Sequence, residues 1–86
     1  MSQLSQLKSQ LSQMASDIEK TAGAISSFSS KFSSSIASVQ ASIGGTASSE
    51  DTEMIASFQQ ANQEVTSAAQ SLRQASEKAK NWAAKA

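Results

Sequence analysis

The chain has 86 residues, of which seven are basic and seven acidic, so its formal net charge is zero. This length allows one domain, residues 1–86, with a limited core. The chain contains no His and no Cys, which excludes the usual zinc, haem and iron–sulfur sites as well as His- and thiol-based catalysis. The zero net charge argues against binding to nucleic acid. We therefore expect no enzyme, no catalytic or metal site and no cofactor.

The first half of the chain repeats apolar residues at steps of three or four, which predicts a helix over residues 3–43. One row recurs every seven residues: Leu4, Leu11, Ile18, Ile25, Phe32 and Val39. A companion row holds the apolar residues Leu7, Met14 and Phe28. Its three other positions are polar, and at each of them the next residue in the sequence is apolar: Ala22, Ile36 and Ile43. Seven-residue repeats of this kind are typical of helices that pack along a coiled-coil stripe.

Residues 26–35 include seven serines, and serine is a mediocre helix former because its hydroxyl competes for backbone hydrogen bonds. Ile25, Phe28 and Phe32 keep the helical period through this run. The run is therefore read either as a helix with a polar outer surface or, alternatively, as a functional hinge.

The break between the two halves is predicted at Gly44 and Gly45, with a turn over residues 44–49. Glycine is favoured just after a helix C-terminus because it tolerates positive φ. Ser48 or Ser49 is a suitable N-cap for the next helix. Three acidic residues follow in its first turn, where the helix dipole favours anions, and this explains them better than metal binding does: Glu50, Asp51 and Glu53.

The second half predicts a helix over residues 50–85 with two further seven-residue rows. One row contains Met54, Ala61, Ala68, Ala75 and Trp82, and the companion row contains Phe58, Val65, Leu72, Ala79 and Ala86. A short turn between two long helices makes them antiparallel neighbours. The fold expected is thus an all-α, two-helix hairpin in which Leu11 faces Trp82, Phe32 faces Ala61, and Ile36 lies near Phe58.

A two-helix hairpin cannot enclose a core, so its net stability is expected to be small. We expect it to complete a four-helix bundle with a second hairpin or with a partner's helices. Trp82 is read either as a residue that closes the open end of the hairpin or as an anchor for a partner, because tryptophan is enriched at interface hot spots. The candidate partner-binding residues are Leu4, Leu7, Leu11, Met14, Ile18, Phe28, Phe32, Phe58, Leu72 and Trp82.

A Cys-free hairpin of under 100 residues, rich in Ser, Ala and Gln and with a glycine-containing central turn, resembles the WXG-type small proteins of Gram-positive type VII secretion. It looks closest to the divergent small companions of LXG-type toxins. Ile43-Gly44-Gly45 stands where that family has Trp-x-Gly, so Gly45 alone matches. The family's export signature, an aromatic followed four residues later by an acid, is not seen, because Phe58 is followed by Asn62 and Trp82 by Ala86.

The resemblance implies a secretion substrate or targeting factor that binds a helical partner, such as a toxin's N-terminal region or a paralogous hairpin, or that forms a homodimer. It also implies a cytoplasmic protein that is then secreted by a non-Sec route, since we see neither a Sec-type signal peptide nor a membrane-spanning stretch. The alternative function is a structural coiled-coil module that self-assembles as a filament or appendage subunit. A membrane-surface helix is disfavoured because the polar face has few basic residues.

Overall fold

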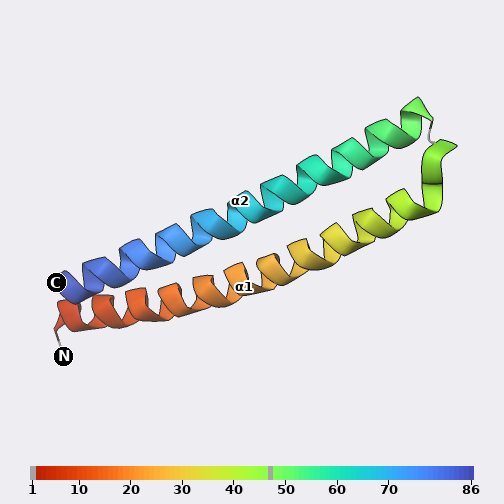
Figure 1. Ribbon diagram of the computed structural model, residues 1–86. Coiled ribbons are helices and arrows are strands. Elements are labelled where there is room, and N and C mark those ends of the chain that lie inside the picture. The colour runs from red at the N-terminus through yellow and green to blue at the C-terminus, as the bar shows by residue number, and fades with distance from the viewer. Residues whose placement is uncertain (1, 47) are drawn as a thin grey trace.

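The computed structural model describes residues 2–46 and 48–86 and forms an antiparallel two-helix hairpin, as expected from the sequence (Figure 1). Helix α1 spans Gln3–Ile43, the short 3-10 helix η1 spans Gly44–Thr46, and helix α2 spans Ser49–Lys85. The hairpin is a rod measuring 67 × 16 × 14 Å, with both chain ends at one end and the turn at the other. Met1 and Ala47, which belongs to the predicted turn 44–49, lie outside the described residues.

Serine side chains cap the beginnings of both helices. The Ser2 hydroxyl accepts a hydrogen bond from the backbone N–H of Ser5 at 3.1 Å. At α2 the Ser48 hydroxyl accepts from the N–H of Asp51 at 3.2 Å, while the N–H of Ser48 donates to the Asp51 carboxylate at 3.1 Å. This reciprocal pair is a capping box. Because Ser48 is the cap, α2 begins at Ser49, one residue before the predicted start.

Gly44 ends α1 with a positive φ of 70° and a ψ of −155°, and its N–H donates to the carbonyl oxygen of Gln40. This region of backbone space is accessible almost only to glycine. The prediction that the chain leaves the first helix at Gly44 is therefore confirmed by the backbone geometry.

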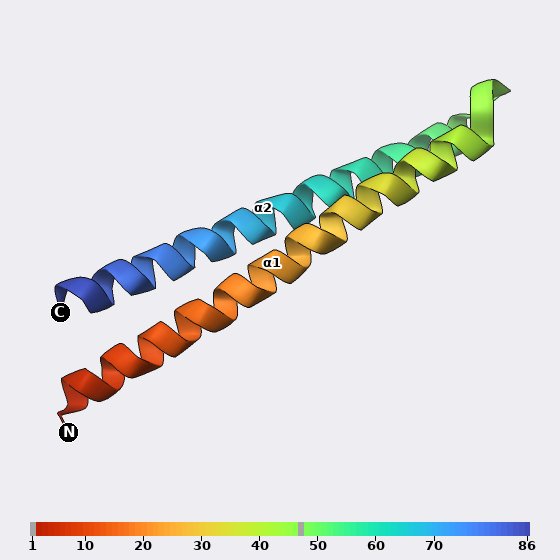
Figure 2. The same cartoon turned by 60° about the horizontal axis from the view of Figure 1, so that its bottom comes forward.

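Helix α1 continues without a break through the serine run of residues 26–35. The serine run was interpreted either as a helix with a polar outer surface or as a hinge, and the structure has the continuous helix. Figure 2 shows α1 as one unbroken ribbon from the N-terminus to the turn.

The seam between the helices, meaning the line along which they approach most closely, is formed mainly by small residues. Six described residues are buried: Ala15, Ala22 and Ile36 on α1, and Ile55, Ala69 and Ser76 on α2. On each helix these positions differ by multiples of seven, as expected for a coiled-coil contact. Small side chains at such positions allow the two helix axes to come close together.

The predicted heptad phase of α2 is wrong by one residue. The row Met54, Ala61, Ala68, Ala75 and Trp82 was expected to face α1. Instead, the row that begins at Ile55 faces α1 and continues through Asn62, Ala69, Ser76 and Ala83, and both Met54 and Trp82 are exposed. The companion row through Phe58, Val65, Leu72 and Ala79 is half-buried, as expected.

On α1 the row through Leu11, Ile18, Ile25, Phe32 and Val39 is half-buried, but Leu7, Met14 and Phe28 turn outward. The Phe32 ring lies 6.0 Å from the Phe58 ring, centroid to centroid. Phe32 was expected opposite Ala61, so the contact is shifted toward the turn by about one helical turn.

Candidate protein-binding face

The hairpin carries large apolar side chains on its outer surface. Met14 is 55% exposed, Phe28 54%, Leu4 47% and Trp82 45%, and Leu7 and Met54 are also exposed. Leu7, Met14 and Phe28 follow the heptad period on α1, while Met54 and Trp82 follow it on α2. The seam is occupied by the row one position further along the sequence, which includes the buried Ala15 and Ile55, so the rows of Met14 and Met54 are turned out of the hairpin.

Two shallow apolar grooves show that the rows of α1 and α2 lie on the same side of the hairpin. One groove is lined by Ile25, Phe28, Val65 and Ala68, together with Thr21 and Ala24. The other brings Met14 and Ile18 of α1 together with Leu72 of α2. We call this side the apolar face and define it by its exposed and half-buried residues: Leu7, Leu11, Met14, Ile18, Ile25, Phe28, Phe32, Met54, Phe58, Ala61, Val65, Ala68, Leu72, Ala75, Ala79 and Trp82.

The opposite side of the seam carries hydrogen bonds between the helices, and we call it the polar face. The Ser29 hydroxyl donates to the Asn62 side-chain oxygen at 2.8 Å and lies 3.1 Å from the Thr66 hydroxyl. Arg73 donates to the Ser26 hydroxyl at 2.9 Å. Two serines of the run thus join α1 to α2, which gives that run a structural role on this face.

Glu19 and Lys80 form an ion pair across the same face. The Ser76 hydroxyl is fully buried and lies 3.1 Å from the Ala15 carbonyl oxygen and 3.3 Å from a Glu19 carboxylate oxygen. The hydrogen bond from Lys80 lowers the pKa of Glu19, with smaller contributions from the charge of Lys80 and the Ser76 hydroxyl, against the opposing effect of desolvation. Both side chains of the ion pair are about half exposed, so solvent screens it.

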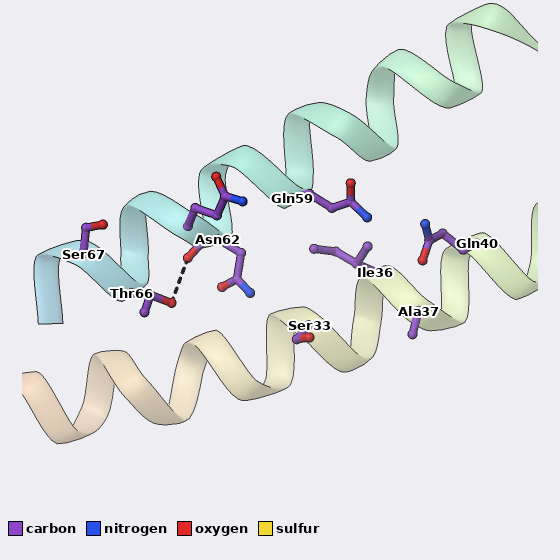
Figure 3. Close-up of a pocket in the computed structure, with 9 residues that line it drawn as sticks. Ser33, Ile36, Ala37, Gln40, Gln59, Asn62, Thr66 and Ser67 are labelled. Carbon is purple, nitrogen blue, oxygen red and sulfur yellow. Dashed lines mark hydrogen bonds between the residues drawn. The ribbon is translucent and has the colours of Figure 1, made fainter. Parts of the chain in front are cut away.

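A broader groove nearer the turn, also on the polar face, is lined mainly by amide and hydroxyl side chains. Gln40 and Gln59 approach it from opposite helices, and Asn62 and Thr66 line its α2 wall (Figure 3). The Thr66 hydroxyl donates to the Asn62 carbonyl oxygen at 3.1 Å. It also lies 3.1 Å from the Ser29 hydroxyl on α1. The polar face therefore presents mainly exposed amide and hydroxyl groups, in contrast to the apolar face.

The predicted partner-binding residues fall into two groups in the structure. Leu4, Leu7, Met14, Phe28 and Trp82 are exposed, whereas Leu11, Ile18, Phe32, Phe58 and Leu72 are half-buried between the helices. Met54 is 39% exposed and was missed, although it belongs to the same heptad row as Trp82. Gly44 and Gly45 lie in η1, at the end of the rod.

Among residues 2–46 and 48–86, no group of three carboxylates is close enough to hold a metal ion. In the same part of the chain, neither helix contains a stretch long and apolar enough to cross a membrane. The chemical character of the candidate site is thus that of an extended apolar surface with polar margins. Comparison of the chain with known protein families, curated proteins and solved structures finds no match in any of the three.

Proposed function

We propose that this hairpin is a small type VII secretion substrate or accessory protein that binds the helices of a partner protein through its apolar face. The observation that carries the proposal is the separation of the two faces. One face bears the exposed Met14, Phe28 and Trp82, and the other bears the interhelical hydrogen bonds. Extended exposed apolar surfaces on soluble proteins mark sites of interaction.

The shape of the apolar face favours a helical partner. Its rows follow the heptad period over both helices, and its grooves lie between side chains three or four residues apart, such as Ile25 and Phe28. Ridges of side chains on another helix fit grooves with this spacing. Docking of two further helices would bury the half-exposed rows and complete a four-helix bundle.

The assignment to type VII secretion comes from the resemblance to the small companions of LXG-type toxins. In that class the partner is the helical N-terminal region of a toxin, and the small protein helps to deliver it to the secretion machinery. We propose the same role here, with the exposed residues of the apolar face as the principal contacts.

The proposal is tested by co-expressing the chain with the helical N-terminal region of a toxin encoded beside it. Met14→Glu combined with Phe28→Glu places two charges on the apolar face at side chains that are more than half exposed. We expect this variant to remain helical and to lose co-purification with the toxin region. Gln40→Glu combined with Gln63→Glu adds the same charge to the polar-face groove and should bind like the wild type.

Equal binding by both double variants would overturn the proposal that the apolar face is the contact surface. Binding to no neighbouring toxin, together with growth of the purified chain into filaments, would instead support the structural self-assembly function. Circular dichroism of each variant separates lost binding from lost helix.

A further inference from the structure

The two helices pair along the seam at steps of seven residues. Toward the open end, where both chain ends lie, the Ser76 hydroxyl contacts the Ala15 carbonyl oxygen at 3.1 Å. Two heptads nearer the turn, the Ser29 hydroxyl donates to the Asn62 side-chain oxygen at 2.8 Å. The buried residues one heptad from these contacts complete the series. From the open end to the turn, the layers of the seam are Ala15 with Ser76, Ala22 with Ala69, Ser29 with Asn62, and Ile36 with Ile55.

A seven-residue repeat permits a competing register in which the helices are displaced by one heptad. In this slipped register Ile55 would pair with Ile43, and Ser76 would meet the backbone carbonyl of Ala22 in place of that of Ala15. Such a displacement of about 10 Å does not change which rows face the seam, because both helices repeat every seven residues. The sizes of these seam side chains therefore do not exclude the slipped register.

The layer of Ser29 and Asn62 does discriminate between the registers. In the slipped register Asn62 would face Ile36, and Ser29 would face Ala69. The half-buried Asn62 side chain would then lie against an aliphatic group and lose the hydroxyl from which it now accepts a hydrogen bond. A polar group that leaves water and finds no partner costs more free energy than an ordinary hydrogen bond contributes. Displacement in the opposite direction would place Asn62 against Ala22, with the same loss.

The other polar contacts between the helices discriminate less. The ion pair of Glu19 and Lys80 is about half exposed, and the hydrogen bond from Arg73 to Ser26 is exposed. In the slipped register Ser26 would lie beside Lys80, which is also a positively charged donor. Exposed ionic contacts contribute little net free energy because solvent screens them.

We infer that Ser29 and Asn62 are the positioning residues that fix the register of α1 against α2. The pair is the one layer of the seam in which both side chains are polar and bond directly to each other. A single asparagine at a contact position of a coiled coil fixes the register at a cost in stability, since an apolar pair would pack there more favourably. The Thr66 hydroxyl, 3.1 Å from that of Ser29, supports the same pairing.

The register in turn determines the shape of the apolar face. It places Leu72 of α2 beside Met14 and Ile18 of α1, where the three line one groove. In the slipped register Ala79 would take the place of Leu72, and the groove would lose its largest side chain from α2. A hydrogen bond on the polar side of the seam thus controls the surface on the other side.

The test requires a turn that leaves both registers open, because a short turn also restricts how far the helices can slip. An insertion of about ten glycine and serine residues between Gly45 and Thr46 keeps the caps at Gly44 and Ser48, and flexible loops of this length cost little. Ser12→Cys and Ser57→Cys place one spin label at an exposed position on each helix, in a chain with no cysteine of its own. Double electron–electron resonance, with the labelled chain diluted in unlabelled chain, measures the distance between the two labels. With the wild-type seam we expect one distance, the same as without the insertion.

Ser29→Ala with Asn62→Ala makes this layer equivalent to the alanine layer beside it. In the chain with the insertion, this variant should show a second population in which the distance between the labels is about 10 Å longer, the rise of seven helical residues. Ser29→Asn with Asn62→Ser reverses the pair and should restore the single distance. Ser30→Ala with Gln63→Ala removes an exposed serine and an exposed amide instead, and this matched control should keep the single distance.

Asn62→Ala alone is the milder variant and should show the same second population. Circular dichroism should find both alanine variants as helical as the wild type, because alanine is a better helix former than serine or asparagine. A single unchanged distance in both variants, whatever their melting temperatures, would show that the pair only stabilises the seam and would overturn the inference. Two distances with the wild-type seam would overturn it as well. No partner takes part in these measurements, so their outcome is independent of the proposed function.

Discussion

The Ser76 hydroxyl lies 3.1 Å from the carbonyl oxygen of Ala15, and both residues are fully buried where the two helices meet. The contact joins α1 to α2 at positions 61 residues apart in the chain. A side chain larger than serine has no room there without separating the helices. The fully buried Ala22 of α1 and the nearly buried Ala69 of α2 extend the same narrow seam toward the turn.

Ser76→Leu should therefore destabilise the hairpin by about 1–3 kcal/mol, the usual cost of overfilling a packed site. Urea denaturation followed by circular dichroism measures the change. Gln70→Leu, which adds a leucine at an exposed position of the same helix, is the matched control and should change the stability by no more than about 0.5 kcal/mol. Equal effects of the two substitutions would contradict close packing at Ser76.

Gly44→Ala should lower the stability by about 1–3 kcal/mol, because the residue has φ 70° and ψ −155°, a conformation that strains any residue with a Cβ. Gly45→Ala is the control. A Cβ at Gly45 would meet no described atom within 4 Å, and Gly44 alone among the described glycines has positive φ. Thermal melting of both variants should show a clear fall in Tm for the first and little change for the second.

Gly23→Ala should stabilise the chain by about 0.5–1 kcal/mol. Gly23 is exposed in the middle of α1, and an added Cβ would meet no described atom within 4 Å. Alanine loses less backbone entropy than glycine when a helix forms. The gain should appear as a higher urea midpoint with an unchanged slope, whereas a loss of stability would indicate an unrecognised contact at this position.

The ion pair between Glu19 and Lys80 should make part of the stability pH-dependent. Because the pKa of Glu19 in the folded chain lies below its ordinary value of 4.5, the ionised carboxylate stabilises the fold above that pH, and this contribution is lost as the pH falls through the folded-state pKa. Glu19→Gln should lower Tm slightly at pH 7, and the gap to wild type should close toward pH 3. Glu77→Gln, the same substitution at an exposed glutamate of α2, is the comparison. A gap between Glu19→Gln and wild type that stays constant with pH would contradict the expectation.

The heptad period and the turn chemistry were sufficient to predict both helices and the break between them. Ile25, Phe28 and Phe32 continue the heptad period through the serine run. The positive φ of Gly44 and the N-cap at Ser48 can be predicted from the residue types alone. These are local properties, and local properties can be read from a single sequence.

The phase of the seam could not be read in this way. Met54 and Ile55 are adjacent and both apolar, so apolarity alone does not decide which of them turns toward α1. The choice is made by packing against α1, which buries Ile55, Ala69 and Ser76 and leaves Met54 and Trp82 exposed, and this packing is not a local property of the sequence. Asn62 was missed for a related reason, because its role depends on Ser29, which lies 33 residues earlier in the chain.

A seam made largely of alanine and serine also determines how the hairpin responds to what it binds. Such a contact buries little apolar surface, so the unbound chain has only a small margin against unfolding. Any molecule that covers the apolar face binds only the folded form and raises the melting temperature by mass action, in proportion to the logarithm of its concentration above the dissociation constant. The melting temperature of the hairpin, followed against added candidate proteins, is consequently a direct reporter of occupancy that needs no label.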